Sequence, residues 1–231
     1  MPFQLFGTQH FITLALCLLV IAGVPLMTRK KTDSTKVLIA KIIGVVIFVN
    51  LIDQIFNAFT FNLGWQEALP LHMCDLAGLA MGVYLIFDKK IFFNIGFFWG
   101  TGGPLMAILT PDLQHAFPHG LYVPFFYGHS LTLLGIAYCL IVFKVRPYLG
   151  DLIRIVFITS AAAIIIYFIN VLIDSNFWFL ISKPVAASIM DIFPDPPMHL
   201  LFLTPLVVFV FIATYLPYWV VDFKKQLSKY G

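Results

Sequence analysis

The stretch VLIAKIIGVVIFVNLIDQIFNAFTF, residues 37–61, decides the fold. It contains only two charged side chains, Lys41 and Asp53. About 20 consecutive apolar residues in a helix span the ~30 Å hydrocarbon layer of a bilayer. The stretch is therefore long enough and apolar enough to predict a transmembrane helix.

Six further apolar runs accompany this one in a chain of 231 residues. The chain is 61% hydrophobic and 11% charged, whereas a soluble domain carries about 25% charged residues. Too little polar surface remains to cover a globule in water. The expected fold is an all-α membrane protein, a seven-transmembrane helix bundle that forms a single polytopic membrane domain over residues 1–231. The helices are predicted at residues 10–28, 37–61, 70–87, 91–109, 123–143, 152–173 and 198–221.

The loops between these runs alternate in charge. Eleven of the 14 Lys and Arg lie in one set of loops and in the C-terminal tail: Arg29, Lys30, Lys31, Lys36, Lys89, Lys90, Lys144, Arg146, Lys224, Lys225 and Lys229. Basic loops face the cytoplasm, so the C-terminus is predicted to be cytoplasmic. Seven crossings then place the N-terminus outside a cell membrane. The net charge of +3 follows from this placement, and no nucleic-acid partner is predicted.

The first run is expected to be retained as a helix. Residues 1–9 hold no Lys or Arg, whereas a secretory signal peptide begins with a positively charged region.

The fourth run is interrupted by Gly100-Thr101-Gly102-Gly103-Pro104. Proline removes a helical hydrogen bond and clashes with the preceding turn, so a broken helix is predicted here. Backbone groups freed at membrane depth must be satisfied by protein or by a water-filled cavity. Close helix packing through small residues is the alternative explanation. Residues 174–197 are too apolar for an ordinary outer loop, and they are expected to lie along the interface as a short amphipathic or re-entrant element.

Four polar residues interrupt the second run at steps of three and four: Asn50, Asp53, Gln54 and Asn57. Such spacing predicts one stripe on a helix. Ionisable groups within a span usually face the bundle interior and mark function. Asp53 is the costliest member to bury, so it is the best candidate for a functional role, although a structural polar seam would give the same pattern.

The third run opens with Leu69-Pro70-Leu71-His72-Met73-Cys74-Asp75. Asp75 is expected near the positive end of the helix dipole, which stabilises a carboxylate. Cys74 lies about 200° around the helix from His72, so these two cannot pair. If Cys74 is a nucleophile, its base comes from another helix. His129, on the fifth run, is the first choice and His199 the second. The alternative is that Cys74 only fills space in the core.

The chain resembles the YwaF-type family of bacterial integral membrane proteins. Four stretches carry the resemblance: residues 69–75; Leu109-Thr110-Pro111-Asp112-Leu113 with Phe117-Pro118; Phe125-Phe126-Tyr127-Gly128-His129; and Asn176-Phe177-Trp178-Phe179-Leu180 with Lys183-Pro184, Ser188 and Asp191. An animal transmembrane protein to which this family is related is regarded as an acyltransferase that remodels ether phospholipids, with a cysteine implicated. The resemblance would place that role on Cys74, through the Leu-Pro-Leu-x-x-Cys match.

Two classes of function follow. In the first, a lipid-directed acyltransferase or hydrolase uses Cys74 as nucleophile, His129 as base, and Asp53 or Asp75 to orient the imidazole. Its expected partners are membrane lipids, with a phospholipid or acyl substrate and no cofactor or metal. The residues expected to bind the substrate are His72, Asn57, Asp112, Lys183, Asp191 and His199. In the second, a small-solute or proton-coupled transporter is lined by the broken helix and the polar stripe. A small-ligand sensor is a third reading.

Overall fold

The computed structural model describes residues 1–184 and 189–230. The helices are α1 (Thr8–Thr28), α2 (Asp33–Thr60), α3 (Met73–Phe87), α4 (Lys90–Gly102), α5 (Pro104–Leu109), α6 (Tyr122–Ile141), α7 (Leu149–Ile173) and α8 (Leu200–Tyr230), with short 3-10 helices η1 (Trp65–Ala68), η2 (Phe177–Phe179) and η3 (Ile189–Ile192). Within the described residues, seven spans are long and apolar enough to cross a membrane. The all-α, seven-span fold class is confirmed.

The third helix begins three residues later than predicted, at Met73 rather than Pro70. Residues 65–68 form η1 instead, and His72 takes the N-cap position of α3. Oδ2 of Asp75 accepts a hydrogen bond from the His72 N–H at 3.2 Å, which satisfies one of the donors that a helix start leaves open. Cys74 and Asp75 therefore lie in the first turn of α3.

The break predicted in the fourth span is present. The first helix of this span, α4, ends at Gly102, and α5 begins at Pro104. The Gly103 N–H still donates to the Trp99 carbonyl at 2.7 Å, and the Gly103 carbonyl accepts from the Ala107 N–H at 2.8 Å. The two pieces thus remain hydrogen-bonded across the joint while the chain changes direction.

The inner helices of the bundle are α3, α4 and α6, whose buried side chains include Met81, Phe93, Phe98 and Tyr138. The outer helices expose many large apolar side chains, as expected of surfaces in lipid. Two polar contacts between helices tie α4 to its outer neighbours. The Trp99 indole donates to Oγ1 of Thr159 on α7 at 2.7 Å, and Oγ1 of Thr214 on α8 donates to Oγ1 of Thr101 at 3.3 Å.

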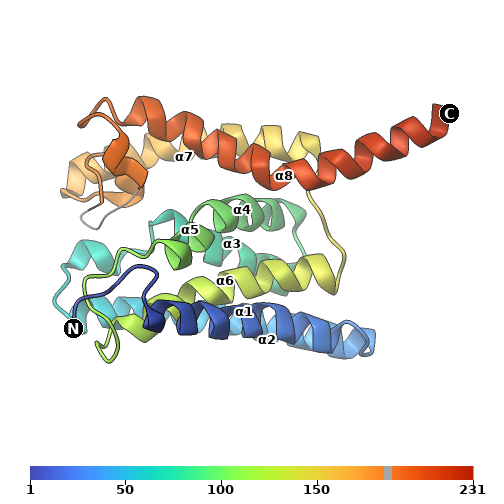
Figure 1. Cartoon of the computed structure of the whole chain (residues 1–231), viewed down its shortest axis with the longest axis horizontal. Helices are drawn as coiled ribbons and strands as arrows, with labels where there is room; N and C mark the ends of the chain where they lie inside the picture. Colours follow the sequence, from blue (N-terminus) through green and yellow to red (C-terminus); the bar gives the residue numbers. More distant parts are fainter. Residues whose placement is uncertain (185–188, 231) are drawn as a thin grey trace.

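The two ends of the bundle carry different segments (Figure 1). One end holds the N-terminus with the chain around residues 61–72, 110–121, 174–184 and 189–199. The other end holds the C-terminus and the basic turns around residues 29–32, 88–89 and 142–148. This alternation is the one on which the positive-inside prediction rests, and the first end is called the N-terminal end below.

The segment after α7 packs onto the bundle at its N-terminal end. Phe177 is fully buried and Trp178 is nearly so. The Trp178 indole donates to the Leu71 carbonyl at 2.8 Å, directly before α3. The described parts of this segment, residues 174–184 and 189–199, are called the cover segment below, and η2 lies over the start of α3. Ser188 lies outside the described residues.

Candidate functional site

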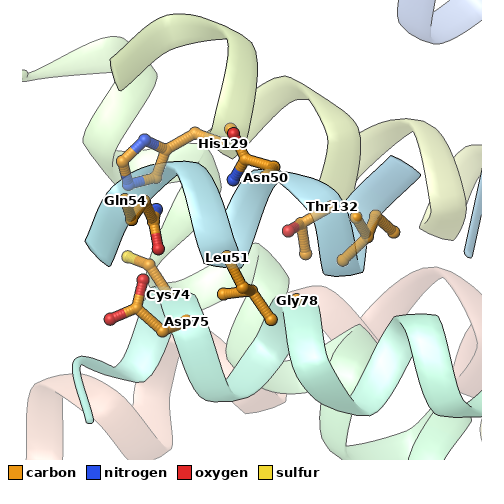
Figure 2. Close-up of a pocket in the computed structure, with 10 residues that line it drawn as sticks. Asn50, Leu51, Gln54, Cys74, Asp75, Gly78, His129 and Thr132 are labelled. Atoms are coloured by element: carbon orange, nitrogen blue, oxygen red, sulfur yellow. The ribbon is translucent and has the colours of Figure 1, made fainter. Parts of the chain in front are cut away.

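A small polar cavity lies between α2, α3 and α6 (Figure 2). Its lining residues Cys74 and Asp75 lie in the first turn of α3, at the N-terminal end of the bundle. The cavity has a volume of about 10 Å³, close to the least that holds one water molecule. Its lining combines apolar side chains with an unusual number of polar ones for an intramembrane position: Ile47, Asn50, Leu51, Gln54, Cys74, Asp75, Gly78, Gly128, His129 and Thr132.

Each helix contributes one face to the cavity. On α2 the lining residues are Ile47, Asn50, Leu51 and Gln54, which follow the i, i+3, i+4, i+7 spacing of a single helical face. The Gln54 side chain lies close enough to the Asp75 carboxylate of α3 to interact with it. In Figure 2, Gln54 extends between His129 on one side and Cys74 with Asp75 on the other.

Cys74 is held by the break in the fourth span. A Cβ atom added at Gly103 would lie 3.0 Å from the Cys74 Sγ and 3.6 Å from the Cys74 backbone nitrogen. Only a glycine lets the α4–α5 joint approach so closely. The thiol is therefore confined between this joint and the cavity. In the first turn of α3, the N–H groups of Cys74 and Asp75 have no carbonyl partner within the helix.

His129 is oriented by the backbone of its own helix. Its Nδ1 lies 2.6 Å from the Phe125 carbonyl oxygen, and its ring packs against the Phe125 ring with centroids 4.4 Å apart. A carbonyl can only accept, so Nδ1 donates. In the neutral imidazole the proton is then on Nδ1, and Nε2 carries the free lone pair. Figure 2 shows the Nε2 edge of the ring turned toward Gln54.

Asn50 is 5% exposed and packs against the backbone of α6. A Cβ at Gly128 would lie 2.8 Å from Nδ2 of Asn50. Oδ1 of Asn50 has no hydrogen-bond partner among the described residues. On the same wall, a Cβ at Gly78 would lie 3.1 Å from Oγ1 of Thr132. The absence of side chains at these glycines thus lets polar groups of neighbouring helices meet.

The structure brings together three of the four expected catalytic residues: Cys74, Asp75 and His129 all line the cavity. Asp53 does not belong to this set. Its side chain is exposed and accepts a hydrogen bond from Nδ2 of Asn57 at 3.1 Å. The carbonyl of Phe125, rather than Asp53 or Asp75, accepts from Nδ1 of His129. The expected orienting carboxylate is therefore replaced by a main-chain group.

His72 and Asp112 do not line the cavity. Nε2 of His72 lies 3.3 Å from Oε2 of Glu67, and its ring meets Phe177 edge-on at 4.9 Å. Asp112 is exposed and close enough to His72 to interact with it electrostatically. These groups form a polar rim between the loops, outside the lining of the cavity.

The remaining expected substrate-binding residues lie on the cover segment. Nζ of Lys183 donates to the Phe193 carbonyl at 2.6 Å and lies 3.5 Å from Oδ1 of Asp195. His199 is fully buried, with Nε2 2.9 Å from the Phe179 carbonyl oxygen, and Asp191 is exposed on η3. Lys183 and His199 thus hold the cover segment together, and none of the three lines the cavity.

Sequence reasoning missed Thr132 and gave Gln54 and Asn50 less weight than Asp53. Thr132 follows His129 by three residues, so the two share a face of α6, and that spacing was the available signal. No group of three or more His, Cys, Asp or Glu side chains that could hold a metal ion occurs among the residues whose positions are described.

Seven apolar spans define a multi-pass membrane protein, with a polar cavity between three of its helices. Residues 5–215 match the TMEM164 family. The chain belongs to this family. The YwaF name is not part of that match.

A relative from Treponema pallidum (strain Nichols), an uncharacterized protein, is 32% identical over 71 residues. The match covers 31% of this chain and 29% of that protein. No solved structure matches the chain.

Proposed function

We propose that the chain is a lipid-directed acyltransferase or hydrolase of the membrane, with Cys74 as the nucleophile and His129 as the base. The observation that carries the proposal is that Cys74 of α3 and His129 of α6 line one cavity. A base that takes the thiol proton activates a cysteine nucleophile, and direct transfer from Cys74 to His129 requires Gln54, which lies between them (Figure 2), to move aside. Membership of a membrane-protein family agrees with a substrate in the bilayer.

In the first half-reaction, Sγ of Cys74 attacks the carbonyl carbon of an acyl ester while its proton moves to Nε2 of His129. The hydrogen bond from Nδ1 to the Phe125 carbonyl (2.6 Å) stabilises the imidazolium that forms. The C–O bond of the ester then breaks, the acyl group remains on Cys74 as a thioester, and His129 returns the proton to the departing lysolipid alkoxide.

In the second half-reaction, a hydroxyl group attacks the thioester while Nε2 of His129 takes its proton. The C–S bond breaks, and the Cys74 sulfur recovers the proton from His129. The N–H groups in the first turn of α3, which have no carbonyl partner within the helix, are the donors that we propose for the developing oxyanion in both steps. Asp75, which accepts from the His72 N–H, holds that turn in place.

The cavity of about 10 Å³ is far smaller than an acyl chain. The proposal therefore requires that only the ester group reaches Cys74, after the side chains around it move apart, while the chain itself stays in the lipid. The apolar, partly exposed surface of the bundle is suited to such a chain.

The test is to reconstitute the purified protein in vesicles of defined phospholipid with a labelled acyl chain, and to follow free fatty acid and acyl transfer to added lysolipid by mass spectrometry. Cys74→Ala should abolish turnover, and His129→Gln should lower it by ~10²- to 10⁴-fold. Cys17→Ala serves as the matched control, because Cys17 is a buried cysteine of α1 outside the cavity. If Cys74→Ala turns over as fast as the wild type, the nucleophile is wrongly assigned.

The same vesicles separate this proposal from a transporter. Asp53 is exposed and bonded to Asn57, away from the cavity lining. Asp53→Asn should leave acyl turnover unchanged. Solute flux that requires Asp53 and survives Cys74→Ala would favour a transporter instead.

A further inference from the structure

The buried amide of Asn50 carries an acceptor that nothing in the described chain satisfies. Asn50 is 5% exposed and lines the cavity, and its Oδ1 finds no donor among the described residues. Buried polar atoms in folded proteins almost always have a hydrogen-bond partner, protein or water. The orphaned oxygen therefore indicates a ligand that donates a hydrogen bond within this cavity.

A second free acceptor lines the same cavity. Nδ1 of His129 donates to the Phe125 carbonyl, so Nε2 of the neutral ring has a lone pair and no proton. Oδ1 of Asn50 and Nε2 of His129 are thus two acceptors on residues that line the cavity, as Cys74 does. The cavity volume of about 10 Å³ is close to the least that accepts one water molecule.

Water matches these two acceptors because it has two O–H donors, one for each. An alcohol has one O–H donor, so an alcohol that donates to His129 leaves the Asn50 oxygen unsatisfied. An ammonium group would also donate twice, but it exceeds the available volume once its carbon substituents are included.

We propose that Asn50 and His129 together bind a water molecule, and that this water is the second substrate. The inference rests on the proposed function and selects its hydrolytic branch. The water attacks the carbonyl carbon of the Cys74 thioester while its proton passes to Nε2 of His129. The C–S bond breaks, the sulfur regains the proton, and a fatty acid leaves. Oδ1 of Asn50 holds the second hydrogen of the water throughout and so fixes the direction of its lone pair.

Asn50→Leu removes the acceptor at nearly constant volume. Formation of the thioester needs only Cys74 and His129, so each molecule of this variant should still release one lysolipid quickly. Hydrolysis of the thioester should then slow by roughly tenfold to a hundredfold, the usual effect of misplacing a reactant. The acyl adduct on Cys74 should accumulate, visible as an added mass on the peptide that contains it.

Asn94→Leu is the matched control. Asn94 is a fully buried amide of α4 whose side-chain oxygen and nitrogen both lack partners in the described part of the chain, and it lies outside the cavity lining. This variant should hydrolyse at the wild-type rate. The folded fraction of all variants is followed by size-exclusion chromatography and thermal melting in detergent.

The wild-type protein supplies a measurement that does not depend on any variant. In vesicles prepared in ¹⁸O water and containing lysolipid, the product should be free fatty acid with one ¹⁸O atom, in step with lysolipid release. Acyl groups found only on the added lysolipid would overturn the water site and leave the Cys74 proposal intact. Equal slowing of both half-reactions in folded Asn50→Leu would also overturn it. Absence of any Cys74-dependent turnover would instead refute the proposed function.

Discussion

We predict that the side-chain hydrogen bonds of Asn170, near the end of α7, are the main interaction that holds the cover segment in place. Its Nδ2 donates to the Phe177 carbonyl, and its Oδ1 accepts from the Phe177 N–H, both at 2.8 Å. Oδ1 also accepts from Oγ of Ser175 at 2.8 Å. Asn170 is 1% exposed and Phe177 is fully buried. One side chain therefore satisfies both main-chain groups of a buried residue.

Asn170→Leu strands the N–H of Phe177 and leaves its carbonyl with only the 3.5 Å hydrogen bond from the Leu180 N–H, without changing the volume greatly. A buried main-chain group that loses its partner costs about 1–3 kcal/mol, so the local loss should be about 1–3 kcal/mol. A difference of about 1.4 kcal/mol is a factor of ten in an equilibrium. The middle of this range, about 2 kcal/mol, should make opening of the segment roughly 30-fold more frequent.

The assay is amide hydrogen exchange by mass spectrometry on the protein in detergent, read on peptides that cover residues 175–182. Exchange near residue 72 should also rise, because Trp178 donates to the Leu71 carbonyl. Ser160→Ala is the control on the same helix, since Ser160 is exposed and its hydroxyl bonds only to the Val156 carbonyl within α7. If Asn170→Leu exchanges within twofold of the wild type at residues 175–182, these hydrogen bonds do not hold the segment.

Three further predictions test the contacts around the site. Gly103→Ala places a methyl group 3.0 Å from Sγ of Cys74, so acyl turnover in vesicles should fall roughly tenfold to a hundredfold; Gly23→Ala, with nothing within 4 Å, should not change it. Trp178→Phe leaves the Leu71 carbonyl without its donor and should cost about 1–3 kcal/mol, seen as a lower unfolding midpoint in detergent; an unchanged midpoint would contradict it. The Arg146–Asp222 ion pair (2.6 Å) is partly exposed, and alanine variants in a double-mutant cycle should give a coupling below about 1 kcal/mol. The hydrogen bond to Asp222 raises the pKa of Arg146, so Arg146 stays charged from neutral pH up to the ordinary arginine range and its contribution is lost only above that range; a coupling that disappears near neutral pH through Arg146 would refute this.

The seven spans could be predicted from the sequence because lipid imposes one requirement on all of them. Every crossing needs an apolar run of sufficient length whose backbone hydrogen bonds are all made within the helix. A run such as residues 37–61 can therefore be recognised in the sequence as a spanning helix. The helix break at Gly103–Pro104 was predictable for the same reason, since proline lacks the N–H. The start of α3 was misplaced because Pro70 suits a helix start, whereas the capping contact between His72 and Asp75 fixes it three residues later.

The site was predicted less completely, and α2 shows why. Asn50 and Gln54 lie four residues apart, about 40° around a helix, but Asp53 and Gln54 are adjacent and therefore about 100° apart. The polar residues and the cavity-lining residues of α2 each span about 100° of the helix, but the two sets are offset, so Asp53 and Asn57 fall outside the face that lines the cavity. Which part of the stripe turns inward depends on where α6 packs, and Gly128 sets that contact by admitting the Asn50 amide. A single sequence does not show which glycine of one helix contacts which polar side chain of another.

The polar lining of the cavity costs folding stability, and helix packing alone does not require it. Apolar side chains of similar size would fill this space without burying a carboxyl, an imidazole and two amides, and replacing both partners of a buried polar pair is often neutral or stabilising. Three glycines instead give up packing atoms: a Cβ would lie within 3.1 Å of a polar or sulfur atom at Gly78, Gly103 and Gly128. Each allows a polar group to stand against backbone in a space that excludes lipid. Ionisable side chains so placed within a membrane span usually serve a reaction or a pathway. Among the polar groups that line the cavity, Oδ1 of Asn50 is the buried acceptor without a partner in the described residues, and it therefore calls for a hydrogen-bond donor from outside the chain.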